Sequence, residues 1–176
     1  MITLNYPSTT NLVNRIYQKP LVNLNPDFQE SPVEIYNLRK TEIIHCYKCR
    51  KDKFVIPDTI IHIGIEAFAH CKMLTSIFIP SSVKTIGIFA FSNCINLQSI
   101  ILQSKIPIYL APDTDIFFNV DKVKSVLFVP EGSKYLYQQA SQWQEFVNIQ
   151  EINEYDAIKS LNFNLENPKQ AILKNN

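Results

Sequence analysis

The sequence predicts an α/β solenoid, a coil of stacked turns in which short strands alternate with single helical turns. The first observation is that the segment 54–71 returns 23 positions later as the segment 77–94. The second is that the same residue types recur at equivalent places, namely Pro57 and Pro80, Gly64 and Gly87, Ala67 and Ala90, Phe68 and Phe91, and Cys71 and Cys94. A repeat of roughly 20 to 50 residues is typical of units that bury their apolar faces only against their neighbours.

The strands themselves are the third observation. A short apolar-x-apolar run, three times ended by proline, occurs at 54–57, 77–80, 100–103 and 127–130. The spacings of 23, 23 and 27 place about four extra residues in the third unit, and we expect them within 106–115, where Pro107 and Pro112 interrupt the pattern. Gly64 and Gly87 are expected to give the backbone freedom for a turn. The segment 67–71 is too short for a helix and predicts one helical or 3₁₀ turn.

The parts outside the repeats divide the chain further. Residues 1–45 do not repeat and are expected to form an N-terminal cap over the first turn of the coil at 46–130. Residues 131–152 are expected to form a C-terminal cap, with Ser133 as N-cap of a helix and then a short extended piece. The helical stripe consists of Tyr137, Ala140, Trp143 and Phe146. Residues 153–176 are expected to be a tail or linker.

Composition narrows the classes of function. The 176 residues are 46% hydrophobic with a formal charge of +1, which argues against a disordered polymer and gives no electrostatic reason for nucleic acid or an anionic membrane as partner. No run approaches the roughly 18 apolar residues of a membrane span. No secretory signal is visible at the N-terminus. We also find no phosphate loop or metalloprotease motif, so we expect no enzyme and no cofactor.

The repeat resembles the BspA-like leucine-rich repeats. The resemblance rests on Ile79-Pro80-Ser81-Ser82-Val83, followed by Ile86-Gly87, Ala90-Phe91, Cys94, Leu97 and Ile100. The ending resembles the terminal cap of Bacteroidetes members through Val129-Pro130-Glu131-Gly132-Ser133 and the stripe above. The resemblance implies a right-handed leucine-rich-repeat solenoid used for adhesion or protein binding. It also implies a cell-surface or secreted location, while a cytoplasmic one stays open.

A candidate binding surface follows from strand alternation. The middle residue of each strand should face away from the core, which places Val55, Phe78, Ile101 and Phe128 on one outward stripe. Soluble monomers rarely leave such a stripe bare, so we expect it to meet a protein or host-surface partner, a second copy in a homodimer, or the chain's own terminal segments. Ser76 and Ser99 should rim it with hydrogen-bonding groups. A register error of one residue would exchange the two faces.

A metal or redox site is the alternative chemistry. Cys46 and Cys49 have the spacing of half a zinc site, and His70 and Cys71 lie one turn away. The competing interpretation is an eroded first repeat, in which Cys46 occupies the slot of Phe68 and Cys49 that of Cys71. Cys49, Cys71 and Cys94 would then form a buried column.

The leading hypothesis is therefore a non-enzymatic leucine-rich-repeat module that binds a protein partner through the exposed sheet face. A zinc-stabilised or redox protein and a structural spacer within a surface protein remain as alternatives.

Overall fold

The structure is a computed structural model that describes residues 34–46 and 51–153. The chain divides into two units, Met1–Ser31 and Pro32–Asn176, and the description concerns the second unit by itself.

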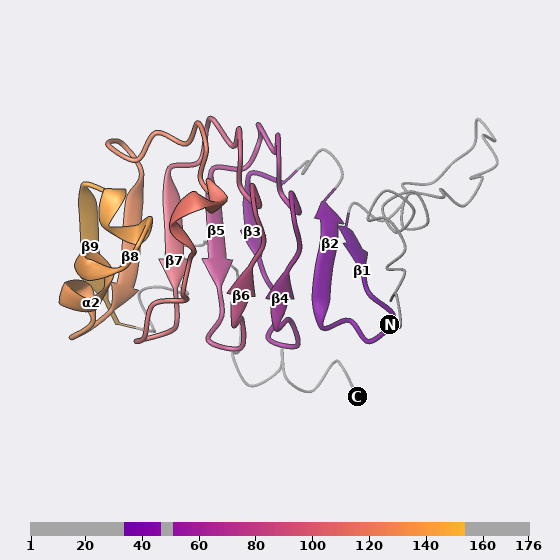
Figure 1. The fold of residues 1–176 in the computed structure, drawn as a ribbon, viewed down its shortest axis with the longest axis horizontal. Helices are drawn as coiled ribbons and strands as arrows, with labels where there is room; N and C mark the ends of the chain where they lie inside the picture. Colours follow the sequence, from indigo (N-terminus) through magenta and orange to yellow (C-terminus); the bar gives the residue numbers. More distant parts are fainter. Residues whose placement is uncertain (1–33, 47–50, 154–176) are drawn as a thin grey trace, which may run out of the picture. The chain divides into compact units, whose positions relative to one another are not determined.

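Five strands form a parallel sheet with one strand from each successive turn of the chain (Figure 1). The strands, in spatial order, are β3 (Lys53–Val55), β5 (Ser76–Ile79), β7 (Ser99–Leu102), β8 (Val126–Pro130) and β9 (Asn148–Ile152). Ile77 pairs with Ile100, and Ile100 with Leu127. The predicted stacking of like residues, 23 and then 27 positions apart, is therefore confirmed.

A second, four-stranded sheet is built from the return path of each turn. Its strands are β1 (Glu34–Tyr36), β2 (Glu42–Cys46), β4 (His62–Ile63) and β6 (Thr85–Ile86). β2, β4 and β6 are parallel, whereas β1 turns back and pairs antiparallel with β2. Asn37 holds that turn, because its side-chain oxygen accepts hydrogen bonds from the backbone N–H groups of Thr41 and Glu42.

A row of aromatic rings runs through the core between the strands. The rings of Phe68 and Phe91 are stacked with centroids 5.2 Å apart, and those of Phe91 and Phe117 are 5.5 Å apart. All three side chains are buried. The ladder of Phe68 and Phe91 was predicted, whereas its third member, Phe117, was not assigned to the repeat.

Phe117 also locates the extra residues of the third unit. Phe117 follows Phe91 by 26 positions and Leu127 follows Ile100 by 27, so three extra residues precede Phe117 and one follows it. The sequence had placed all four within 106–115. The short helix η1 (Pro112–Thr114) lies in the earlier part, and a turn closed by the Ser125 N–H on the Asp121 carbonyl lies in the later part.

The glycines serve close packing rather than the predicted turn. A Cβ at Gly87 would lie 2.5 Å from the backbone nitrogen of Ile65, and one at Gly64 would lie 2.8 Å from the Ile43 carbonyl oxygen. The left-handed turn positions are occupied instead by residues with side chains, among them Glu66 and Phe89, with φ of 55° and 56°. Glycine is required here because successive turns approach each other without room for a side chain.

The C-terminal stripe is not one helix, which corrects the sequence prediction. α2 (Lys134–Gln139) ends before Ala140, and Gln142, with φ of 61°, separates it from η2 (Trp143–Glu145). Residues three apart are displaced by about 60° around an α-helix, so four such residues in a row could not all face one core. The break lets Tyr137, Trp143 and Phe146 all become buried.

The predicted N-cap is also different in detail. Ser133 lies at the N-cap position of α2, but its hydroxyl makes no capping hydrogen bond and donates to the Pro130 carbonyl. No described helix has the length and apolar character needed to cross a membrane.

Candidate binding surface

The outer face of the five-stranded sheet carries the apolar row that the sequence predicted. Val55 pairs with Phe78, Phe78 with Ile101, and Ile101 with Phe128. Phe78 and Ile101 form a hydrophobic cluster separate from the main core, and Val55, Phe128 and Ile152 pack against it. We call these five residues the outer-face cluster. The flanking residues of the strands, such as Ile100 and Leu102, belong to the main core, so the predicted register is correct.

The exposure of this face was predicted wrongly at two positions. Ile101 keeps 1% of its surface accessible and Phe78 keeps 9%, whereas Val55 and Phe128 are half-buried. Alternation along a strand assigns a side chain to a face, but it carries no information on whether another part of the chain lies over that face. The centre of the outer-face cluster, at Phe78 and Ile101, is therefore buried.

The hydroxyls of Ser76 and Ser99, the two predicted rim residues, form a hydrogen bond with each other. The Ser99 hydroxyl donates to the Ser76 hydroxyl oxygen at 2.7 Å, and Ser76 is 7% exposed. Ser99 is half-buried and Ser76 is buried, and their role as rim groups of a binding surface stays a prediction.

The cysteines lie in the core. Cys46, Cys71 and Cys94 are buried, and the Sγ atoms of Cys71 and Cys94 donate to the carbonyls of Cys46 and Phe68. The Cys46 N–H donates to the Ala67 carbonyl as the Phe68 N–H donates to the Ala90 carbonyl, so Cys46 occupies the slot of Phe68.

The proposed metal ligands do not converge among the described residues. His70 is exposed, and no group of three potential ligands is found in residues 34–46 and 51–153. Cys49, the remaining residue of that hypothesis, lies outside the described residues.

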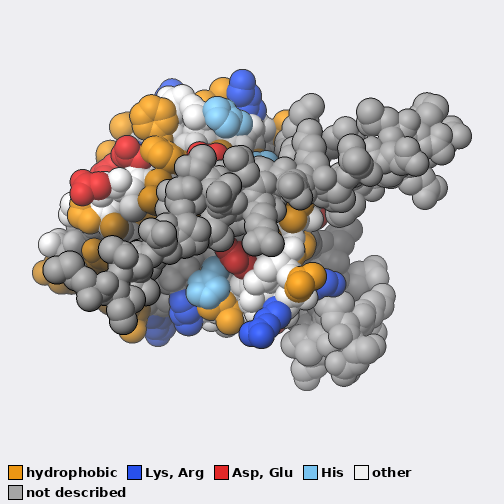
Figure 2. Space-filling model, turned by 45° about the vertical axis from the view of Figure 1, so that its right-hand side comes forward, with side chains coloured by type: hydrophobic (Ala, Val, Ile, Leu, Met, Phe, Trp, Pro, Cys, Tyr) orange, Lys and Arg blue, Asp and Glu red, His pale blue; other side chains and the backbone are white. Residues whose placement is uncertain are grey.

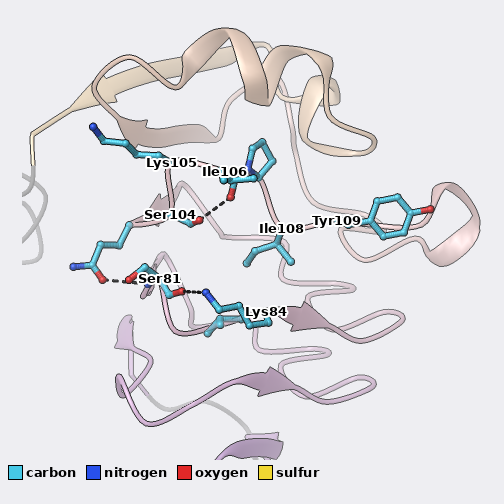
Figure 3. A pocket seen from close by; sticks show the side chains of 10 residues that line it. Ser81, Lys84, Ser104, Lys105, Ile106, Ile108 and Tyr109 are labelled. Atoms are coloured by element: carbon cyan, nitrogen blue, oxygen red, sulfur yellow. Dashed lines mark hydrogen bonds between the residues drawn. The ribbon is translucent and has the colours of Figure 1, made fainter.

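A shallow depression of about 510 Å³ lies beside the enlarged third unit (Figure 3). Its ten lining residues are Ser81, Val83, Lys84, Gln103, Ser104, Lys105, Ile106, Pro107, Ile108 and Tyr109. The lining holds two serines, two lysines and a tyrosine, but no carboxylate, imidazole or thiol.

Hydrogen bonds within the chain occupy some of the polar groups in the depression. The Lys84 amine donates to the Ser81 carbonyl, and the Ser81 N–H donates to the Gln103 side chain (Figure 3). The Tyr137 hydroxyl donates to the Ser104 carbonyl from the C-terminal side. Burial raises the pKa of Tyr137 above its ordinary value, so this phenol stays protonated at neutral pH. Tyr137 thus joins the C-terminal region to the loop that lines the depression.

Charge is dispersed over the described surface. Basic, acidic and hydrophobic side chains are interspersed on the face seen in Figure 2. The ion pairs among the described residues join an exposed group to a half-buried one, as for Lys51 with Glu34 at 3.1 Å and Lys122 with Glu145 at 2.6 Å, or two exposed groups, as for Lys124 with Asp121. The backbone N–H of Lys124 is the main cause of the lowered pKa of Asp121. Such isolated surface pairs steer no highly charged ligand.

The repeat assigns the chain to a class of proteins. Its turns of strand and short helix are those of leucine-rich repeats, and the family described as the BspA type leucine-rich repeat region matches residues 44–167 in six copies. This match spans more than half of the chain, and the chain belongs to that family.

Two solved structures resemble this one. A leucine-rich cell surface protein from Faecalibacterium prausnitzii A2-165 is 18% identical, with a TM-score of 0.35, over 68% of this chain and 37% of that one. A leucine-rich repeat protein from Eubacterium ventriosum ATCC 27560 is 20% identical, with a TM-score of 0.34, over 57% of this chain and 33% of that one. The chain thus spans about a third of the length of each of these two proteins. No curated protein matches the sequence.

Proposed function

We propose that this chain is a non-enzymatic leucine-rich-repeat module that binds a protein partner through the outer face of the five-stranded sheet. The observation that carries the proposal is the outer-face cluster. Its residues lie on five neighbouring strands and contribute nothing to the main core. An outward sheet face without a binding role normally carries polar side chains.

The finer features belong to the same proposal. The stacked turns form a right-handed solenoid with residues 131–152 as its C-terminal cap, while most of the predicted N-terminal cap, residues 1–45, lies outside the described residues. The module acts at the cell surface or after secretion, in adhesion or host interaction, and it needs no cofactor. The family membership supports this assignment, because repeats of this kind present extended surfaces rather than enclosed pockets.

Val55 and Phe128 are the residues to test. Both are half-buried at the two ends of the row, so serine there removes apolar contact without opening the centre. Replacement of Phe78 or Ile101 would instead destabilise the fold, because both are buried. The double variant Val55→Ser/Phe128→Ser and a control, Phe118→Ser, should be compared. Phe118 is 53% exposed and belongs to neither hydrophobic cluster.

The assay is binding to a panel of purified host matrix proteins, measured together with thermal unfolding. We expect the double variant to lose at least tenfold in affinity for the protein that the native chain binds, with a free energy of unfolding lowered by less than about 2 kcal/mol. The control should bind like the native chain. Equal binding by the double variant and the native chain would refute the assignment of this face.

A further inference from the structure

An exposed apolar strip lies on the turns that lead from one sheet to the other. Ile65 lies between β4 and β5, and Ile88 and Phe89 lie between β6 and β7. Their side chains are 65%, 41% and 36% exposed, whereas Phe68 and Phe91 on the same turns are fully buried. We call Ile65, Ile88 and Phe89 the turn strip.

Phe89 occupies a position that is filled by a carboxylate on each neighbouring turn. The Glu66 N–H donates to the carbonyl of Ile88, the residue before Phe89. The Phe89 N–H donates in the same way to the carbonyl of Thr114, the residue before Asp115. Glu66, Phe89 and Asp115 are therefore equivalent residues on three successive turns, and all three have a positive φ, of 55°, 56° and 42°.

This arrangement places a carboxylate on each side of an exposed ring. Two residues further along the same turns, the rings of the core ladder are 5.2 and 5.5 Å apart, so neighbouring turns are separated here by about 5 Å. Glu66 and Asp115 are exposed, and the ion pairs within residues 34–46 and 51–153 involve neither of them. The Phe118 ring packs edge to face against Phe89, with centroids 6.5 Å apart, and supports it from the next turn.

Charge complementarity indicates a cationic occupant for the turn strip. The segments 64–71, 87–94 and 113–120 contain three carboxylates but no lysine or arginine. A cation is attracted both by carboxylates and by the face of an aromatic ring. Arginine suits this combination best, because its planar guanidinium stacks on rings and donates hydrogen bonds to carboxylates, while its aliphatic stem covers apolar surface.

We propose that the turn strip docks a basic segment of a partner protein, with an arginine side chain lying on Phe89 between Glu66 and Asp115. The aliphatic parts of that segment pack on Ile65 and Ile88. Because the strip lies on the turns and not on the outer face of the five-stranded sheet, it is a second surface, distinct from the outer-face cluster.

The test is titration of the full chain with an acetylated and amidated tri-arginine peptide, followed through the backbone amide signals in nitrogen–proton NMR correlation spectra. We expect saturable shifts centred on the amides of Glu66, Phe89 and Asp115. The matched control peptide is tri-citrulline, which keeps the shape of the arginine side chain and lacks its charge, and which should give no saturable shift. Shifts that are absent from these three amides, or equal for the two peptides, would overturn the proposal.

Three variants separate this site from general attraction between charges. Glu66→Gln/Asp115→Asn should weaken tri-arginine binding about fivefold or more. Asp58→Asn/Glu131→Gln removes the same charge from two exposed carboxylates elsewhere and should weaken it less than about twofold. Phe89→Leu keeps an apolar side chain but removes the ring, and it should weaken binding about threefold. Equal losses for the two double variants would mean ionic attraction without a site and would refute the proposal.

This experiment is independent of the one on the sheet face. Its probe is a short peptide rather than a matrix protein, and its readout is local to the turns. A failure here leaves the assignment of the outer-face cluster unchanged, and a failure of the matrix-protein assay leaves the turn strip unchanged.

Discussion

Phe117 joins the ring ladder of the repeats to the aromatic residues of the C-terminal region, and its removal should be costly. The Phe117 ring stacks on Phe91 and contacts Trp143 and Phe146, with centroids 5.2 Å away in both cases. Its side chain is 1% exposed. Phe117→Ala removes a buried ring and leaves a cavity, a change that typically costs about 3–5 kcal/mol.

We place Phe117→Ala in the upper half of that range, at about 4–5 kcal/mol. Each aromatic pair adds about 0.5–1.5 kcal/mol beyond the burial of area, and Phe117 takes part in three such pairs. Urea unfolding followed by circular dichroism measures the loss. With a slope of about 2 kcal/mol per molar urea, the midpoint should fall by roughly 2 M.

The neighbouring residue supplies the control. Phe118 is 53% exposed and contacts Phe89 edge to face at 6.5 Å, so Phe118→Ala should cost less than about 1 kcal/mol. Phe117→Leu, which keeps most of the buried volume, should fall between the two alanine variants. A loss below about 1.5 kcal/mol for Phe117→Ala would refute the inference that the ladder holds the C-terminal region to the repeats.

Three further predictions concern single side chains. Burial raises the pKa of the Tyr137 hydroxyl in the folded chain. As pH rises past about 10, this hydroxyl ionises in the unfolded chain but not in the folded one, so the free energy of unfolding falls. Tyr137→Phe should therefore lose less stability between pH 9 and 11 than the native chain does. Gln142 donates to the Ala111 carbonyl and accepts from the Ile116 N–H, so Gln142→Ala should cost about 1–3 kcal/mol in urea unfolding. Gly87→Ala should lower the melting temperature by well over 5 °C, because its Cβ would meet the backbone of the preceding turn.

Each of these has a matched comparison. Tyr135 is 71% exposed, so Tyr135→Phe should retain the native pH dependence. Gln144 is exposed, and Gln144→Ala should be near neutral; equal losses at Gln142 and Gln144 would contradict the role given to Gln142. Gly132 has φ of 79° with open space around it, so Gly132→Ala should cost only about 1 kcal/mol of backbone strain. If Gly132→Ala lowered the stability as much as Gly87→Ala, the close approach of successive turns would not explain why position 87 requires glycine.

Because the sequence repeats, the strand pairing and ring stacking of the repeat units could be predicted from it. When like residues return every 23 positions, stacked turns place them above one another, so the pairing of Ile77 with Ile100 and of Phe68 with Phe91 could be foreseen. The same alternation correctly put Val55, Phe78, Ile101 and Phe128 on one face. These are local regularities, and they require no knowledge of distant parts of the chain.

The features that the sequence did not predict lie where the repeat is irregular or where alternation along a strand gives no information. Phe117 was not assigned to the repeat, because the extra residues before it change the spacing from 23 to 26. A signal was present, since Ile116-Phe117 followed by Asn119 parallels Ala90-Phe91 followed by Asn93. The burial of Ile101 and Phe78 could not be foreseen, because strand alternation assigns a side chain to a face and does not give its exposed fraction. The break at Gln142 had a signal, since a strict spacing of three does not suit an α-helix.

Trp143 is the single tryptophan of the chain, and it is fully buried at the end of the ring row. Its indole N–H is bound to the Ile108 carbonyl, and the Tyr137 ring lies 5.8 Å away, well within the range of excitation transfer. The emission of Trp143 therefore reports on the last turns, whereas circular dichroism averages over all of them. A red shift in emission that precedes the loss of dichroic signal would be a direct optical record of fraying from this end.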